Sequence, residues 1–128
     1  MPKAIRIHET GGPEVLRWED VDVESPGAGE VALRQTAVGL NYIDTYHRTG
    51  LYPLELPTIL GREAAGVVEQ VGAGVEELQV GDRVAYALEA GAYCESRVIA
   101  ADRLVRLPDT VDDYTAAAMM LKGLTAHY

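Results

Sequence analysis

The sequence has few of the residues that proteins use to hold metals or to form covalent cross-links. Its 128 residues include one cysteine, three histidines and no phenylalanine. The single cysteine, Cys94, cannot form an internal disulfide, which is consistent with a reducing cytoplasm. It also excludes a four-cysteine zinc lobe within this chain. His8, His47 and His127 are too scattered to form a recognisable metal motif, so packed or exposed histidines are expected.

Positive charge and long apolar runs are also scarce. Lysine and arginine number 11 against 20 acidic residues, which gives a net charge of -9 and a pI near 4.7. Surfaces that bind nucleic acid or anionic membranes need a basic patch, so neither partner is expected. No apolar run approaches the ~20 residues of a membrane span. The N-terminus lacks the apolar stretch of a signal peptide, and we therefore expect a cytoplasmic protein.

What the sequence does contain is a series of short alternating segments separated by glycine and proline. Two segments have helical character: 42–48, ending near Gly50, and 114–128, which follows the acidic pair Asp112 and Asp113. Residues 51–60 carry two prolines and are expected to form an irregular loop. Strands are expected at 3–8, 15–23, 30–38, 64–71, 91–100 and 104–107, with a further strand that follows a turn at 80–84 and ends at 88. Many short strands with this punctuation predict a mainly β fold, a partly open barrel with short helices.

Without phenylalanine, the core must consist of valine, leucine, isoleucine and alanine. Within 30–38 the alternation places Val31, Leu33 and Gln35 on one face. Trp18 is expected to cover one end of the core, and Cys94 to be a buried strand residue. Gly66 lies inside an expected strand, where it allows another backbone or a ligand to approach closely.

Two short segments carry most of the functional information. The first, 39–46, reads Gly-Leu-Asn-Tyr-Ile-Asp-Thr-Tyr and contains Asn41, the only asparagine of the chain. The second, 61–66, reads Gly-Arg-Glu-Ala-Ala-Gly. Zinc is held by thiolate, imidazole and carboxylate groups. The neutral amide of Asn41 and the guanidinium of Arg62, which offers only donors, are poor zinc ligands, so no metal is expected.

Six motifs in sequence order extend this observation along the whole chain. They are Gly-Gly-Pro at 11–13, Gly-Glu-Val at 29–31, the 39–44 segment, Gly-Arg-Glu-Ala-Ala-Gly-Val-Val at 61–68, Val-Gly-Asp-Arg-Val at 80–84, and the stretch from 116 to 128. With them the chain resembles the GroES-like catalytic domain that opens medium-chain dehydrogenases and reductases. Asn41 and Arg62 stand where zinc-dependent members often have cysteine and histidine. The chain therefore resembles the zinc-free branch, the NADPH:quinone oxidoreductases related to zeta-crystallin.

The resemblance implies a division of the chain and a missing partner domain. Residues 1–111 would form the GroES-like domain, and 112–128 the start of a helix that leads into a Rossmann domain absent from this chain. The glycine-rich segments 27–32 and 72–77 do not supply the dinucleotide fingerprint, which must follow a strand and open a helix. The chain is thus interpreted as an N-terminal portion.

The same resemblance implies an activity. Hydride would pass from NADPH to a quinone or another α,β-unsaturated carbonyl without zinc, and the cofactor would be held mainly by the missing domain. Family members commonly form dimers through that domain, so a homodimer is expected. Two alternatives stay open: an enoyl-thioester reductase of the same superfamily, and a folded domain that has no activity by itself.

The candidate site residues have structural interpretations beside the functional ones. Asn41 can cap a helix or lie beside the nicotinamide ribose, and Asp44 can be its capping partner. The phenols of Tyr46 and Tyr52 can donate to a developing oxyanion, or their rings can simply pack. Arg62 can form a structural ion pair with Glu63, fill the volume of the lost metal or reach the cofactor. The resemblance assigns catalytic roles to Asn41, Tyr46, Tyr52 and Arg62, and cofactor contacts to Asn41, Tyr42, Asp44, Thr125 and Tyr128.

Overall fold

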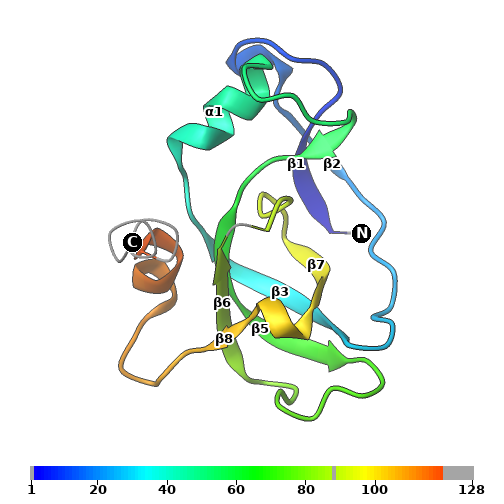
Figure 1. Cartoon of the computed structure of the whole chain (residues 1–128), viewed down its shortest axis with the longest axis vertical. Coiled ribbons are helices and arrows are strands. Elements are labelled where there is room, and N and C mark those ends of the chain that lie inside the picture. The colour runs from blue at the N-terminus through cyan, green and yellow to red at the C-terminus, as the bar shows by residue number, and fades with distance from the viewer. Residues whose placement is uncertain (1, 88, 120–128) are drawn as a thin grey trace.

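The computed structural model describes residues 2–87 and 89–119, which form two antiparallel sheets with few helices (Figure 1). A helix without a label covers residues 113–119. The other elements in chain order are β1 (Lys3–Ile7), η1 (Pro13–Val15), β2 (Arg17–Asp20), β3 (Glu30–Val38), α1 (Tyr42–Thr49), β4 (Thr58–Ile59), β5 (Glu63–Val71), β6 (Arg83–Ala87), β7 (Ser96–Ala100), η2 (Ala101–Arg103) and β8 (Val105–Arg106).

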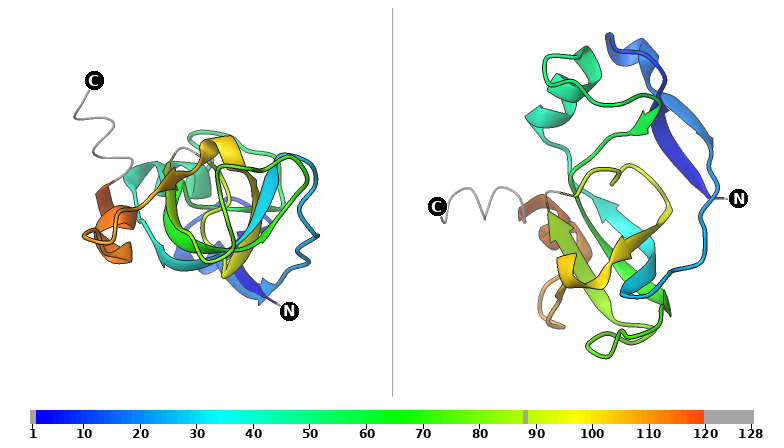
Figure 2. Two further views of the ribbon diagram at one scale, coloured as in Figure 1. Left: turned by 90° about the horizontal axis from the view of Figure 1, so that it is seen from below. Right: turned by 45° about the vertical axis from the view of Figure 1, so that its right-hand side comes forward.

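The larger sheet has the strand order β7-β3-β5-β6-β8 and is strongly curved, as Figure 2 shows. Its strands supply most of the main core cluster. The smaller sheet has the order β2-β1-β4. Residues 92–95 join the two sheets. The amide of Ile5 in β1 donates to the carbonyl of Tyr93 at 2.8 Å, and the amide of Gln35 in β3 donates to that of Glu95 at 2.8 Å. This connection produces the mainly β, partly closed architecture that the sequence predicts.

The largest fully buried side chain among the described residues is a tyrosine. Tyr86 in β6 is fully buried, together with Val31, Leu33 and Val68. A buried phenol needs a polar partner. Its hydroxyl donates to the Gln35 amide oxygen and accepts a 3.1 Å hydrogen bond from Arg97. The Gln35 amide nitrogen donates in turn to two backbone carbonyls at 2.7 Å. The predicted inward face of 30–38 is confirmed.

Three sequence expectations differ from the structure. The expected strand 15–23 is broken, because Pro13 fixes a 3-10 turn through Val15 and only Arg17–Asp20 pairs with β1. Trp18 does not cover the core: it lies on this edge strand and is 59% exposed. The expected strand 91–100 is shortened to Ser96–Ala100 with one isolated bridge at Cys94, because residues 92–95 bond to several different segments. The expected loop at 51–60 contains the short strand β4.

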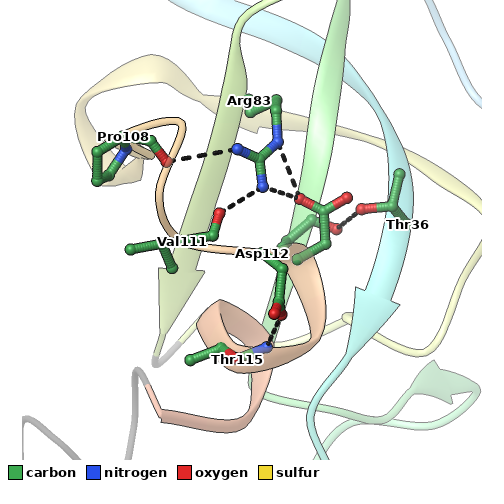
Figure 3. Close-up of polar contacts among 8 residues, drawn as sticks. Thr36, Arg83, Pro108, Val111, Asp112 and Thr115 are labelled. Atoms are coloured by element: carbon green, nitrogen blue, oxygen red, sulfur yellow. Dashed lines mark hydrogen bonds and ion pairs between the residues drawn. The ribbon is translucent and has the colours of Figure 1, made fainter.

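The helix at 113–119 is attached to the barrel by Arg83 and Thr36, whose side chains both bond Asp113, and by the packing of two helix alanines (Figure 3). Arg83 in β6 donates to Asp113 at 2.7 Å and to the carbonyl of Val111 at 2.6 Å. Asp112 caps the helix by accepting the backbone amide of Thr115 at 2.7 Å. The expected acidic cap is therefore confirmed. Within the described ranges, the structure contains no helix with the length and apolarity needed to cross a membrane.

Candidate functional site

The 39–46 motif forms the entry to α1, and Asn41 is its N-cap residue. Asn41 has an extended backbone, and together with Asp44 it forms a capping box. The Asp44 carboxylate accepts the backbone amide of Asn41 at 3.1 Å. At the other end Gly50 ends the helix with φ of +88° and donates to the carbonyl of Tyr46 at 3.1 Å. The capping interpretation of Asn41 and Asp44 is confirmed.

The eight residues of α1 have two different faces. Residues three or four apart share a face of a helix. Tyr42 and Tyr46 share the outward face, with 83% and 37% of their surfaces exposed. Asp44 and His47 share the inward face and are buried, at 3% and 7% exposed. The helix thus presents two aromatic rings on its outward face and a carboxylate and an imidazole on its inward face.

The outward face continues into the loop that follows the helix. The ring of Tyr52, half exposed, meets the ring of Tyr46 edge to face, with centroids 5.4 Å apart. Leu51 beside it is 64% exposed. Within the described residues neither phenol hydroxyl has a hydrogen-bond partner. The pair offers two donors and an aromatic surface to a planar molecule.

The inward face belongs to a buried polar cluster. Tyr93 donates from Oη to Asp44 Oδ2 at 2.5 Å. Burial, followed by the bond to Asp44, raises the pKa of Tyr93 far above its usual range, so the phenol remains a donor. Burial, followed by the charge of Arg62, lowers the pKa of His47 below 6.5, while Asp44 acts weakly in the opposite direction. His47 is therefore neutral at physiological pH and contributes a polar but uncharged surface.

The 61–66 motif meets this cluster from the other side. Gly61 has φ of +100°, and a Cβ built there would lie 2.5 Å from the ring of Tyr93. Arg62 follows immediately, and its Nε is buried with no hydrogen-bond partner among the residues that the structure describes. Glu63 is fully buried, and its carbonyl accepts the amide of Gly39 at 2.9 Å. The two motifs, about twenty residues apart in sequence, are therefore adjacent in space.

Two cavities open beside the residues that precede Asn41. One has a volume of about 530 Å³ and is lined by apolar side chains that include Trp18, Val38 and Leu40. The other, about 320 Å³, lies between Val38–Leu40 and Tyr114 on the helix at 113–119. None of the four predicted catalytic residues lines either cavity. Asn41 directly precedes α1, Tyr46 lies on it, Tyr52 lies in the loop that follows, and Arg62 directly precedes β5.

The residues at this site do not fit zinc. The described part of the chain contains no group of three or more histidine, cysteine, aspartate or glutamate side chains that could hold a metal ion. Asn41 and Arg62 supply an amide and a guanidinium at the two motif positions. Cys94 is buried, and burial raises the pKa of its thiol to about 11, which disfavours the thiolate form that zinc requires.

The structure therefore brings Asn41, Tyr42, Asp44, Tyr46, Tyr52 and Arg62 into one region around α1. Thr125 and Tyr128 lie outside the described residues. Two members of the region were missed by sequence reasoning. The sequence alone gives His47 no special role, although its spacing of three from Asp44 places both on one helix face. Tyr93 carries no local signal, since its contact with Asp44 spans 49 residues of sequence.

The fold and the two motifs define a GroES-like domain, and comparisons with known proteins identify its family. Residues 27–109 match the alcohol dehydrogenase GroES-like domain, so the chain belongs to that family. A quinone oxidoreductase from Pseudomonas aeruginosa is 54% identical over 100% of this chain and 40% of its own length. A 2-haloacrylate reductase from a Burkholderia species is 48% identical with the same coverage.

Solved structures agree with the sequence comparisons. The quinone oxidoreductase of Escherichia coli, solved in complex with NADPH, superposes with a TM-score of 0.95 at 45% identity. The match covers 98% of this chain and 39% of that protein. The chain thus spans about 40% of the length of the relatives it matches and corresponds to their N-terminal portion. The resemblance to quinone oxidoreductases of the medium-chain superfamily is confirmed.

Proposed function

We propose that this chain forms the substrate side of the active site of a zinc-independent, NADPH-dependent reductase of quinones and related α,β-unsaturated carbonyls. The observation that carries the proposal is the outward face of α1. There Tyr46 and Tyr52 present rings in edge contact and hydroxyls without partners among the described residues. A planar acceptor can pack on such rings, and its oxygen can accept from a phenol.

In this proposal the cofactor, bound mainly by sequence beyond this chain, supplies the hydride. Hydride addition to a quinone or enone leaves negative charge on the carbonyl oxygen. Without a metal, that charge must be stabilised by hydrogen bonds aimed at it. Tyr46 is assigned as the main donor and Tyr52 as a second donor. Asn41 and Tyr42, at the entry of the same helix, would contact the nicotinamide ribose.

Arg62 is proposed to act electrostatically, from the side of α1 that faces the protein interior. Its buried Nε has a free donor among the described residues, and its charge lies close enough to His47 to lower the pKa of the imidazole. A positive charge held behind α1 favours negative charge developing in front of it. Asp44 is assigned as the capping partner of Asn41 and not as a proton donor.

The comparisons support both the acceptor class and the cofactor. Relatives at 46–54% identity are named quinone oxidoreductases, and the homologous Escherichia coli structure contains NADPH. A second candidate substrate class has its own support. The Burkholderia relative is named a 2-haloacrylate reductase, and its acceptor is an alkene conjugated to a carboxylate. Assays should therefore include conjugated acids beside quinones.

The decisive experiment compares phenylalanine variants in a protein that contains this chain and the remainder of its sequence. NADPH oxidation is followed by absorbance with several quinones and with conjugated acids. One lost oxyanion donor costs ~3 kcal/mol, so Tyr46→Phe is expected to lower kcat about 100-fold. Tyr52→Phe should have a smaller effect. Both variants should retain the wild-type unfolding midpoint, because both hydroxyls lack partners among the described residues.

Two results would contradict the proposal. Unchanged turnover of Tyr46→Phe with every acceptor would remove the donor role. Stoichiometric zinc in the purified active protein, measured by metal analysis, would contradict zinc independence. The proposal also includes a domain boundary near residue 111, a homodimer and a cytoplasmic location. Sedimentation of the whole protein tests the dimer.

A further inference from the structure

Tyr93 lies at the junction of the two sequence motifs, although it belongs to neither. Its amide donates to the carbonyl of Leu60 at 2.8 Å, and its carbonyl accepts the amide of Ile5 at 2.8 Å. The backbone of Tyr93 is thus fixed to both the 58–61 segment and β1. Its side chain is also closely packed, because the ring lies so near Gly61 that a Cβ on this residue would not fit.

The hydroxyl of Tyr93 extends this fixed point to α1. It donates to Asp44 Oδ2 at 2.5 Å, a distance typical of strong bonds to carboxylates. The same oxygen accepts the backbone amide of Asn41 at 3.1 Å. Asp44 is 97% buried, so water does not compete for this oxygen. A continuous chain of bonds therefore leads from the sheet junction through Tyr93 and Asp44 to the backbone of Asn41.

We propose that Tyr93 is a positioning residue for the reduction: its hydroxyl, acting through Asp44, fixes the place of Asn41 at the entry to α1. This inference rests on the proposed function, which puts Asn41 at the reacting centre. The ring of Tyr93 lines the larger cavity, but its hydroxyl is engaged by Asp44, so it acts through Asp44. Reacting groups need placement to within a fraction of an ångström, and a misplacement of about 1 Å can cost ~100-fold in rate.

The ring and the hydroxyl of Tyr93 have separable tasks. The ring packs against Gly61 and so supports the segment that carries Arg62, whereas only the hydroxyl reaches Asp44. A phenylalanine at this position keeps the ring contact and removes the bond. Tyr86 offers a control, because its buried hydroxyl also bonds a side chain, Gln35. Gln35 bonds the backbone carbonyls on either side of Tyr93, so Tyr86→Phe tests whether a disturbance beside Tyr93 that leaves its bond to Asp44 intact affects turnover.

The experiment compares Tyr93→Phe with Tyr86→Phe in the whole protein, with NADPH and a quinone as substrates. Both variants should remain folded with a similar decrease in unfolding midpoint. Tyr93→Phe is expected to lower kcat ~10-fold with KM for the quinone nearly unchanged, since positioning acts on the reacting geometry. Tyr86→Phe should leave kcat within about twofold of wild type. Equal kcat values for the two variants would overturn the proposal.

A double variant tests whether Tyr93 acts through Asn41. In an Asn41→Ala background, Tyr93→Phe should cause no further loss of kcat, because residues that act in one chain are not additive. A full additional ~10-fold loss would show that Tyr93 acts elsewhere and would refute the proposal.

One measurement separates this inference from the proposed function. If wild-type protein reduces no quinone and no conjugated acid, the function is wrong, and amide hydrogen exchange then decides the inference. Tyr93→Phe should raise exchange at the amides of Asn41 and Asp44 by ~10-fold, because the bond that holds the first turn of α1 is lost. Tyr86→Phe should leave those amides unchanged. The same exchange in both variants would refute the positioning role.

Discussion

The packing of Gly61 against Tyr93 gives a prediction whose magnitude follows from the structure. In Gly61→Ala the new Cβ would lie 2.5 Å from Tyr93 Cδ1 and 2.9 Å from the backbone nitrogen of Tyr93. The ring can rotate away, but the backbone nitrogen cannot move freely, since it donates to Leu60 at 2.8 Å. Relief of the contact therefore requires a shift of the main chain where the two motifs meet.

Two costs contribute, and a control variant separates them. Gly61 has φ of +100°, where an alanine loses ~1–2 kcal/mol. Overpacking against Tyr93 adds ~1–3 kcal/mol. Gly81 has a similar φ of +95° but nothing within 4 Å of a built Cβ, so Gly81→Ala bears only the first cost. Glycine-to-alanine substitution also lowers the conformational entropy of the unfolded chain. This stabilising effect is common to both variants, so it cancels when their free energies of unfolding are compared.

Urea unfolding followed by circular dichroism measures both variants. Trp18 is a poor probe here because it is already 59% exposed in the folded protein. Gly61→Ala is expected to lose ~1–3 kcal/mol more of its free energy of unfolding than Gly81→Ala. It should also lose turnover, since Tyr93 would be displaced from Asp44. Equal losses of stability in the two variants would refute the claim that Tyr93 is clamped by Gly61.

Two further predictions concern the charged groups. Arg83→Met removes the contacts to Asp113 and Val111 and should lower the free energy of unfolding by about 2 kcal/mol, as for other bonds to charged groups; unchanged denaturation curves would contradict this. The pKa of His47 is lowered, first by burial and then by Arg62, so the unfolded chain binds its proton more readily. Stability should therefore fall as pH decreases through 6.5 toward the lower folded-state pKa, and His47→Gln should flatten this part of the profile, with His8→Gln as the control. A wild-type slope retained in His47→Gln would contradict the assignment.

Features set by local chemistry were predictable from the sequence. The span of β3 follows from alternation, and the limits of α1 follow from Asn41 before it and Gly50 after it. These signals act within a few residues, so one sequence carries them completely. The exposed position of Trp18 was not predictable, because it depends on β2 being the edge strand of its sheet.

The contact between Tyr93 and Asp44 could not be predicted from the sequence either, because it also depends on the tertiary arrangement. Whether Asp44 serves as a cap, an acid or an acceptor depends on which side chain meets it from outside the helix. That side chain is Tyr93, 49 residues away, and its path to Asp44 exists only because residues 92–95 join the two sheets. The strand pattern at 91–100 gave no indication of this break. Contacts of this length are consequences of topology, not of local propensity.

The two faces of α1 carry residues with different roles in the proposed site. On the inward face Asp44 accepts a hydrogen bond from Tyr93, and the charge of Arg62 acts on His47. The outward face holds Tyr46, whose ring meets that of Tyr52, and the ring of Tyr52 also meets the ring of His47 with centroids 6.3 Å apart. If the proposed function holds, substitution of Tyr46 should alter which planar acceptor packs there. Substitution of Tyr93 should in that case change the geometry for every acceptor alike, so a ratio of kcat/KM between two acceptors distinguishes the two positions.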